Sequence, residues 1–254
     1  MSEYVLQVTG LIKRFSRKGQ TDVVAVDEVS FDIRPRECVG LVGGSGSGKS
    51  TIAKLVTGLL EPTSGSVLVG GHDVTHVRGA ARRKLAQQIQ MVFQDPVTSF
   101  DPRRRLGDGI AEGMRNFGTP KEEANEQVKR LLVRCGLPTV LAERYPREVS
   151  GGQCQRAAIA RALALRPALI ICDEATSALD VTVQAQIMEL LRDVRTETGA
   201  AMLFICHDLA LVQGFCDRIM VMRAGRIVES GPTDSVLMWP QHPYTAQLLD
   251  AVLA

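Results

Sequence analysis

The 254-residue chain lacks a dominant charge of one sign, because 30 Lys and Arg residues are offset by 28 Asp and Glu residues. This balance gives no bulk electrostatic reason to bind nucleic acid or an anionic membrane, and we expect no nucleic-acid partner. No apolar run reaches the ~18 residues that a membrane-spanning helix needs. The nearest candidate, 157–172, is interrupted by Arg161 and Arg166. At the N-terminus, Met1-Ser2-Glu3-Tyr4 lacks the basic and apolar segments of a secretory signal.

Patterns typical of disulfides or metal sites are also scarce. The six cysteines form no CxxC pair, and three of them lie in apolar runs typical of buried strands. We therefore expect reduced, mostly buried thiols rather than a disulfide framework or a zinc site. His72 and His76 are four residues apart, but they lie in a turn between a strand and a helix, which is more typical of a loop than of a metal site.

What the chain does contain is a regular alternation of short apolar runs with amphipathic helical patterns. Apolar residues make up 45% of the chain and charged residues 23%, as in ordinary soluble globular proteins. The runs that indicate buried strands are 38–42, 168–172, 202–206 and 219–222. The helical pattern after the first run extends through Leu59 and ends before Pro62. This alternation predicts an α/β fold with a mostly parallel sheet covered on both faces.

Two regions depart from that alternation. Residues 4–34 and 66–70 show the period-two pattern of antiparallel strands. Residues 96–150 contain helical patterns between prolines and no convincing strand. We predict that this second region is a helical insertion into the α/β core.

A glycine-rich loop follows the first buried run, with the sequence Gly43-Gly44-Ser45-Gly46-Ser47-Gly48-Lys49-Ser50, and Thr51 comes next. Glycines allow the backbone to curl so that its N–H groups form a nest for a phosphate, and the following helix presents its positive N-terminus to the same anion. Lys49 is predicted to reach the β- and γ-phosphates, and Ser50 to offer a hydroxyl to Mg²⁺. The loop therefore predicts binding of ATP with Mg²⁺.

A second buried run, Leu169-Ile170-Ile171-Cys172, ends in the acidic pair Asp173-Glu174. A carboxylate at the carboxyl edge of a sheet, beside a phosphate loop, is suited to a water-mediated contact with Mg²⁺, which is the role predicted for Asp173. Glu174 is then predicted to polarise the water that attacks the γ-phosphate.

Between these two motifs, Ser150-Gly151-Gly152-Gln153 opens a helical pattern. Ser150 is a plausible N-cap, and two glycines permit close approach of a ligand; taken alone, a simply capped helix explains the pattern equally well. The order of glycine loop, capped helix and acidic strand resembles the ATP-binding cassette superfamily, and the resemblance covers nearly the whole chain. It implies a P-loop NTPase core with a mostly parallel sheet, an N-terminal antiparallel β subdomain and a helical insertion subdomain. The expected division is a single cassette over 1–254, with the core and β subdomain at 1–94 and 151–254 and the helical subdomain at about 95–150.

The resemblance also implies roles for residues outside the phosphate loop. Val149-Ser150-Gly151-Gly152-Gln153 resembles the family signature, which completes the ATP site of a partner subunit. Gln94 resembles the residue that touches Mg²⁺ and water and connects to the transmembrane partner. Ser177-Ala178-Leu179-Asp180 resembles the loop that crosses the dimer interface. His207 resembles the switch histidine that contacts the γ-phosphate.

Phe15 occupies the place where the family stacks an aromatic ring on adenine. Two positions depart from the family pattern: Ala175 stands where proline is usual, and Cys154 replaces a common Arg or Gln. Neither change removes a phosphate or Mg²⁺ ligand, so we expect hydrolysis to be retained.

Three hypotheses are open within the superfamily: the ATPase subunit of a membrane importer, a soluble cassette protein of DNA repair, chromosome organisation or translation, and an assembly ATPase of a cytosolic enzyme complex. Chromosome-type members insert long coiled coils, repair-type members carry CxxC modules and translation-type members join two cassettes; this chain has none of these. The stretch from Gln94 to Arg103 and His242-Pro243-Tyr244-Thr245 resemble the peptide/nickel group of importer ATPases. The same C-terminal motif is similar to one in the carbon–phosphorus lyase complex, which makes a cytosolic assembly ATPase the alternative.

The importer hypothesis implies specific partners. We expect two transmembrane permease subunits, a second related ATPase subunit in a heterodimer or homodimer, and indirectly a substrate-binding protein. The expected location is the cytoplasmic face of the inner membrane, as a peripheral subunit. Dipeptide, oligopeptide, glutathione, nickel and a metallophore complex all stay open as cargo.

Overall fold

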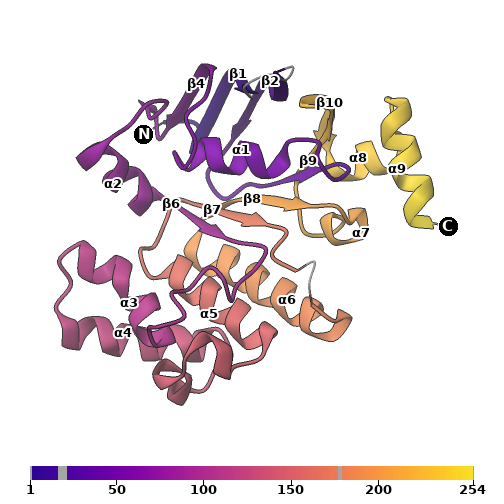
Figure 1. The fold of residues 1–254 in the computed structure, drawn as a ribbon. Helices are drawn as coiled ribbons and strands as arrows, with labels where there is room; N and C mark the ends of the chain where they lie inside the picture. The colour runs from indigo at the N-terminus through magenta and orange to yellow at the C-terminus, as the bar shows by residue number, and fades with distance from the viewer. Residues whose placement is uncertain (1, 17–21, 177–178, 254) are drawn as a thin grey trace.

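Two sheets organise the chain in the computed structural model, which describes residues 2–16, 22–176 and 179–253 (Figure 1). The larger sheet has the order β10-β9-β3-β8-β7-β6; all neighbours are parallel except the edge strand β10, which pairs antiparallel with β9. Its strands are β3 (Cys38–Val42), β6 (Ile89–Val92), β7 (Leu169–Asp173), β8 (Ala201–Cys206), β9 (Arg218–Arg223) and β10 (Arg226–Pro232). The mostly parallel sheet predicted from the apolar runs is confirmed.

The smaller sheet is antiparallel, as the period-two pattern predicts. Its order is β2 (Val23–Ile33), β1 (Leu6–Phe15), β4 (Ser64–Val69) and β5 (His72–Asp73). Leu6 pairs with Ile33 on one side and with Val69 on the other, and all three side chains are buried. His72, expected in a turn, instead pairs with Val69 in a two-residue strand.

Helix α1 (Lys49–Val56) follows the glycine-rich loop, and α2 (Gly79–Gln88) leads into β6. The expected continuation of α1 through Leu59 is wrong, because the helix ends at Val56. Gly58 adopts φ +67, a left-handed conformation that terminates helices, and Leu59 is left 51% exposed.

The remaining helices lie mostly below the larger sheet in Figure 1. They are α3 (Leu106–Asn116), α4 (Lys121–Arg134), the 3₁₀ turns η1 (Thr139–Glu143) and η2 (Pro146–Glu148), α5 (Gly151–Leu163), α6 (Val181–Thr198), α7 (Leu209–Val212), α8 (Thr233–Met238) and α9 (Pro243–Leu253). Residues 96–150 contain helices and turns and no strand, all of them described, as predicted. None of the described helices is both long and apolar enough to cross a membrane.

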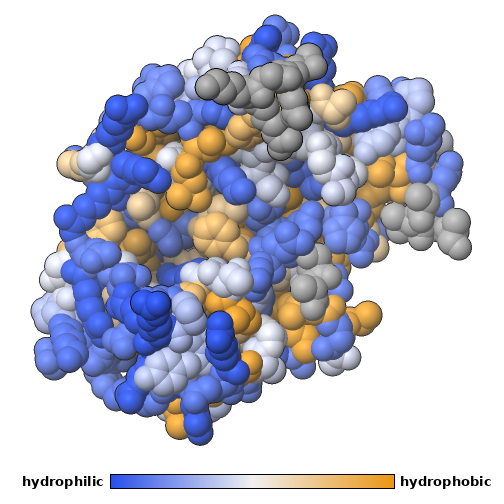
Figure 2. Space-filling view, viewed as in Figure 1, coloured by the Kyte–Doolittle hydropathy of each residue, from blue (hydrophilic) through white to orange (hydrophobic). Residues whose placement is uncertain are grey.

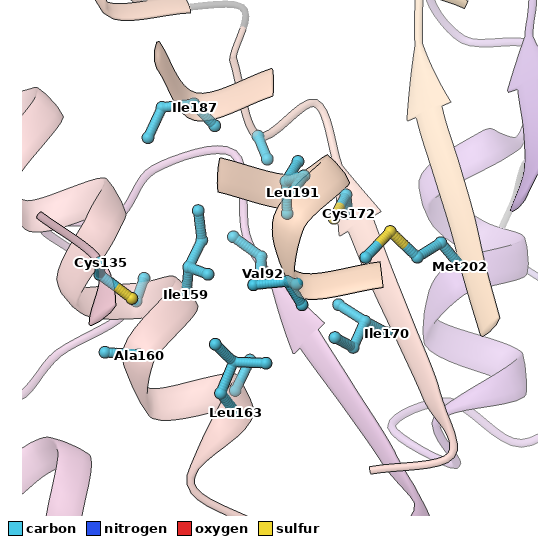
Figure 3. Packing of buried hydrophobic residues seen from close by; sticks show 14 of the residues in the cluster. Val92, Cys135, Ile159, Ala160, Leu163, Ile170, Cys172, Ile187, Leu191 and Met202 are labelled. Carbon is cyan, nitrogen blue, oxygen red and sulfur yellow. The ribbon is translucent and has the colours of Figure 1, made fainter. Parts of the chain in front are cut away.

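Alternation along β3 sends side chains into two separate cores. Cys38 and Val42 join the cluster formed with α3, α4, α5 and α6, whereas Val39 and Leu41 join the cluster formed with α1 and the antiparallel sheet. Figure 3 shows the first cluster, in which Ile159 of α5 packs toward β6 and β7. Helices α1 and α5 therefore cover opposite faces of the same sheet (Figure 1).

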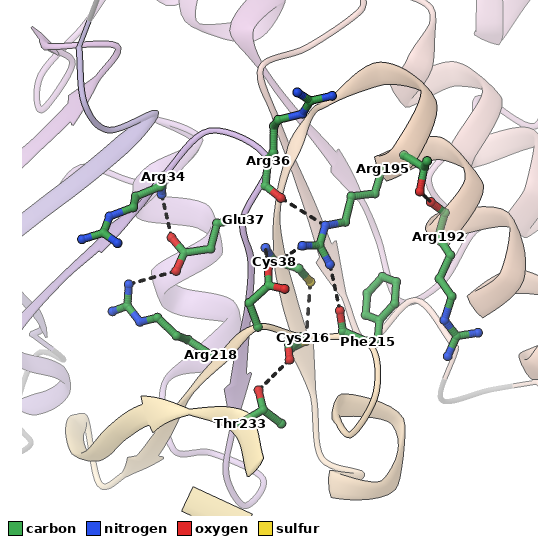
Figure 4. Close-up of polar contacts among 12 residues, drawn as sticks. Arg34, Arg36, Glu37, Cys38, Arg192, Arg195, Phe215, Cys216, Arg218 and Thr233 are labelled. Carbon is green, nitrogen blue, oxygen red and sulfur yellow. Dashed lines mark hydrogen bonds and ion pairs between the residues drawn. The ribbon is translucent and has the colours of Figure 1, made fainter. Parts of the chain in front are cut away.

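Polar contacts tie the amino ends of the strands, opposite the glycine loop (Figure 4). The Asp217 carboxylate accepts the Cys38 backbone N–H at 2.8 Å and also pairs with Arg195. Arg195 in turn donates to the backbone carbonyls of Arg36 and Phe215, each at 3.1 Å. These bonds join β3, α6 and the start of β9, so this edge of the sheet has its own polar anchor.

The six cysteines report on how closely the core is packed. All six thiols are buried, as predicted, and none of them is in a disulfide in the part of the chain that the structure describes. Burial raises the pKa of Cys135 and of Cys206 to about 12. Since the thiolate is the reactive form, a disulfide reagent at pH 8 should label the native protein slowly and all six thiols rapidly in denaturant. Rapid native labelling of even one thiol, followed by peptide mapping, would contradict this packing.

Candidate nucleotide-binding site

The glycine-rich loop connects the carboxyl end of β3 to the first residue of α1. Two of its glycines are required sterically. A Cβ on Gly43 (φ +153) would lie 2.2 Å from the carbonyl oxygen of Met222, and one on Gly48 (φ +111) would lie 2.3 Å from that of Ala25. The loop is thus held closely between β9 and β2, and the N-terminus of α1 opens from it as an anion site.

Lys49 is buried inside the loop that it follows. Its ammonium group donates to the carbonyl oxygens of Gly43 at 2.8 Å and Gly44 at 3.0 Å. Burial lowers the pKa of Lys49, and the carboxylates of Glu174 and Asp173 oppose that shift. A desolvated cation beside the N-terminus of a helix is suited to polyanionic phosphate groups.

Ser50 and Asp173 meet although 123 positions separate them in the chain. The Ser50 hydroxyl donates to the Asp173 carboxylate at 3.0 Å. Burial raises the pKa of Asp173, and the hydrogen bond from Ser50 partly offsets that shift. A hydroxyl beside a carboxylate is a set of hard oxygen donors, which fits Mg²⁺.

Glu174 comes next, where the chain leaves β7 in an unusual backbone conformation. Its φ of +49 is rare for a residue with a side chain, and its N–H donates to the Ile205 carbonyl at 2.9 Å. Gln94 donates to the Glu174 carboxylate at 2.9 Å, and the His207 Nδ1 lies 4.0 Å from the same oxygen. The structure therefore brings Gln94, Glu174 and His207 together from three strand ends.

A cavity of about 110 Å³ opens beside this group. The residues that line it are Glu174, Thr176, Gln184, Cys206, His207, Asp208 and Leu211. His207 is exposed and Cys206 is buried, so the cavity has a solvent-facing rim and an apolar wall. Such a cavity offers room for a water molecule next to a carboxylate.

The Ser150–Gln153 segment belongs to a different part of the molecule. The Ser150 hydroxyl caps α5 by accepting the Gln153 N–H at 3.2 Å, and the Gln153 side-chain oxygen accepts the Ser150 N–H at 3.0 Å. Gly152 is packed against α6, because a Cβ there would lie 2.6 Å from Val183. Since α5 covers the face of the sheet opposite α1, the structure does not bring this segment to the phosphate loop of its own chain.

Two further predicted residues lie at the periphery. Asp180 caps α6 by accepting the Val183 N–H at 3.0 Å and is exposed; Ser177 and Ala178 of the same predicted loop lie outside the described residues. Phe15 is 39% exposed at the end of β1, with the Lys13 ammonium 5.2 Å from its ring centre. Its partner Val23 stands two residues from Ala25, whose carbonyl faces Gly48, so Phe15 is on the strand pair that borders the loop.

A tyrosine that was not predicted as part of the site hydrogen-bonds to the loop. The Tyr244 hydroxyl, from α9, accepts the Gly44 N–H at 2.9 Å. The His-Pro-Tyr-Thr motif singled out this tyrosine for its resemblance to a family motif, but nothing in the local pattern indicates a contact 200 positions away.

Comparisons with known proteins show which family the sequence is similar to. The family model described as ABC transporter matches residues 26–177. A probable peptide ABC transporter ATP-binding protein of Sinorhizobium fredii is 47% identical over 258 residues, which cover 99% of this chain and 73% of the relative. A putative peptide import ATP-binding protein of Brucella ovis is 45% identical over 250 residues, which cover 98% of this chain and 78% of that relative.

Solved structures give the same result. The structure of cbiO1 from Clostridium perfringens, part of the ABC transporter complex cbiONQ, has a TM-score of 0.81 at 30% identity, with 94% of this chain and 92% of that chain covered. A bacterial ABC transporter cassette solved as a dimer has a TM-score of 0.83 at 28% identity, with 90% and 98% covered. A dimeric post-hydrolysis state bound to ADP and Pi has a TM-score of 0.82 at 27% identity, with the same coverage.

The chain therefore belongs to the ABC transporter family. Within that family it is an ATP-binding cassette with ATP-hydrolysing activity, and both the fold and the enzyme class expected from the sequence are confirmed.

Proposed function

We propose that this chain is the ATP-hydrolysing subunit of a peptide importer. The observation that carries the proposal is the meeting of Lys49, the Ser50–Asp173 pair and the Gln94–Glu174 pair at the carboxyl edge of one sheet. The two relatives named for peptide transport support peptides as the class of cargo.

The loop N–H groups and Lys49 bind the phosphates of ATP in this proposal. Ser50 and Asp173, with Gln94, are the residues that would hold Mg²⁺, which when bound neutralises charge on the phosphates. Glu174 accepts a hydrogen bond from the attacking water and polarises it toward the γ-phosphate. His207, whose Nδ1 lies 4.0 Å from that carboxylate, contacts the same phosphate group in this proposal. Phe15 supplies a ring for adenine at the border of the loop.

The role of Glu174 predicts a separation of binding from turnover. Glu174→Gln keeps the shape of the side chain but removes the base, so MgATP affinity should stay within about threefold while hydrolysis falls about 100-fold or more. Lys49→Ala should instead weaken binding, because it removes the cation that faces the phosphates. Glu189→Gln, an exposed change on α6, is the control. Normal hydrolysis by Glu174→Gln would show that another group polarises the water.

We further propose that the active unit is a dimer of cassettes, with a second, related ATPase chain as the expected partner. Two of the similar solved structures are dimers. A capped helix N-terminus on the far face of the sheet suits the Ser150–Gln153 segment to the phosphates of a partner's ATP rather than its own. Leu179 lies beside this segment, since a Cβ on Gly151 would lie 3.9 Å from the Leu179 side chain.

A matched pair of variants tests this composite site. Both Ser150→Asp and Ser150→Asn preserve a good N-cap for α5, but only the first adds a negative charge. We expect Ser150→Asp to bind MgATP at its own loop normally and to lose at least about tenfold in turnover through repulsion of the partner's γ-phosphate. Ser150→Asn should hydrolyse ATP at close to the normal rate. Equal rates for the two variants would exclude contact with a phosphate. Changing Gly152 is a poorer test, because any side chain there meets Val183.

The helical segment of about 95–150 is proposed as a subdomain that receives the transmembrane permeases. A hollow of about 550 Å³ separates it from α2, and Figure 2 shows hydrophobic residues between hydrophilic rims there. Its lining includes Gln90 of β6, Phe117 after α3 and Arg83 of α2, whose guanidinium lies 5.1 Å from the Phe117 ring centre. Such a groove would fit one short cytoplasmic helix, so that each of the two permeases would dock on one ATPase chain of the dimer. Through them the chain would sit peripherally at the cytoplasmic face of the inner membrane, and a substrate-binding protein would act indirectly.

Gln94 connects this groove to the ATP site, because it follows β6 and donates to Glu174. A change in the γ-phosphate can move the helical segment only through contacts that differ between two states. We predict that Gln94→Ala leaves MgATP affinity within about tenfold, or roughly 1.4 kcal/mol, but uncouples hydrolysis from transport. Peptide uptake and ATPase rate would be measured in vesicles that hold the whole complex, with Gln90→Ala as a groove control. A normal ratio of peptide transport to ATP hydrolysis in Gln94→Ala would show that Gln94 does not couple the two.

A further inference from the structure

The contact between α9 and the phosphate loop involves a single peptide group. The N–H of Gly44 and the C=O of Gly43 belong to the same peptide unit, which is trans. The N–H donates to the Tyr244 hydroxyl at 2.9 Å, and the C=O accepts from the Lys49 ammonium at 2.8 Å. Because N–H and C=O point in opposite directions in a trans peptide, this unit is held at both ends.

The hydrogen bond from the Gly44 N–H to Tyr244 matters because this peptide unit could otherwise rotate. Glycine stands on both sides of it, so side chains offer no steric resistance to a flip of the peptide plane. A flip would turn the Gly43 carbonyl away from Lys49 and remove one of the two oxygens that hold the ammonium group. The Tyr244 hydroxyl opposes such a flip, and hydrogen bonds in series across one peptide polarise each other.

Tyr244 is held by its own contacts and by those of the two residues that precede α9. The Glu229 carboxylate on β10 accepts the N–H groups of Gln241 at 2.8 Å and His242 at 3.1 Å, which anchors the start of α9. Burial opposes ionisation of Glu229, but these N–H groups help bring its pKa below the usual value. The His242 Nδ1 accepts the Tyr244 N–H at 3.1 Å, and the Arg223 guanidinium lies 4.8 Å from the Tyr244 ring centre.

The helix that carries Tyr244 also packs on the body of the cassette. Tyr244, Leu248 and Leu249 are partly buried against the core cluster, and α9 contacts α7, the helix that follows His207. Figure 1 shows α9 beside α7 and α8 at the end of the sheet where the phosphate loop lies. The Tyr244 hydroxyl is therefore held near Gly44 by a helix that is packed against the core.

We propose that Tyr244 is a positioning residue for ATP binding: its hydroxyl orients the Gly43–Gly44 peptide, which in turn holds Lys49 toward the phosphates. This inference rests on the proposed function, since it deepens the account of the same nucleotide site. The affinity for ATP then depends on a residue of α9 as well as on the residues of the phosphate loop.

The test uses Tyr244→Phe, which removes the hydroxyl and keeps the ring against Arg223. MgATP binding is measured at equilibrium in the full chain carrying Glu174→Gln, so that hydrolysis does not intervene. We expect the Kd to rise about threefold to tenfold, the loss that one net hydrogen bond produces. Tyr145→Phe, which removes a tyrosine hydroxyl in the helical segment, should leave the Kd unchanged.

Kinetics then distinguish positioning from a purely structural anchor. In the otherwise unchanged chain, Tyr244→Phe should raise the KM for ATP by the same factor and leave kcat within about twofold, because Glu174 is untouched. A lower melting temperature with unchanged Kd and KM would reduce Tyr244 to an anchor for α9 and overturn the inference. Equal weakening by Tyr145→Phe would overturn it too. Failure of the Glu174→Gln chain with Tyr244 intact to bind MgATP would instead overturn the proposed function, and this inference with it.

Discussion

The parallel pairing of β3 with β8 and of β8 with β7 brings three strand ends to one edge of the sheet. Three of the segments that leave this edge carry parts of the candidate site: the glycine-rich loop after β3, Glu174 after β7 and His207 after β8. The adjacent strand β6 adds Gln94 in the same way. Residues far apart in sequence meet because parallel strands deliver their carboxyl ends to the same side, where ligands bind in sheets of this kind.

The two faces of the sheet pack against different parts of the chain. One face packs against α1 and the antiparallel sheet, which border the phosphate loop. The other face shares its core with α3, α4, α5 and α6, and so with the helical segment proposed to meet the permeases. Both faces of the sheet are closely packed, and the Gln94–Glu174 hydrogen bond lies at the carboxyl end of the strands between them.

Two charged groups of the candidate site, Lys49 and Asp173, are largely removed from solvent. Burial raises the pKa of Asp173 and lowers that of Lys49, so each charged form is disfavoured by its surroundings. A phosphate anion beside Lys49 and a divalent cation beside Asp173 would relieve both costs at once. The left-handed backbone of Glu174 is a further local strain at the place where chemistry is proposed.

The sequence by itself determined the fold class, the phosphate loop, the acidic strand end and the helical insertion, because apolar periodicity and glycine spacing are local patterns. It also identified Ser150–Gln153 as a capped helix start, which α5 bears out. Only the tertiary structure decided which distant groups touch: the bond of Ser50 to Asp173, the bond of Gln94 to Glu174, and the packing of Gly152 against Val183. Only the tertiary structure brings Tyr244 to the Gly44 N–H, 200 positions away in the sequence. Such a hydrogen bond depends on how the strands pair and the helices pack, and no local sequence pattern encodes this packing.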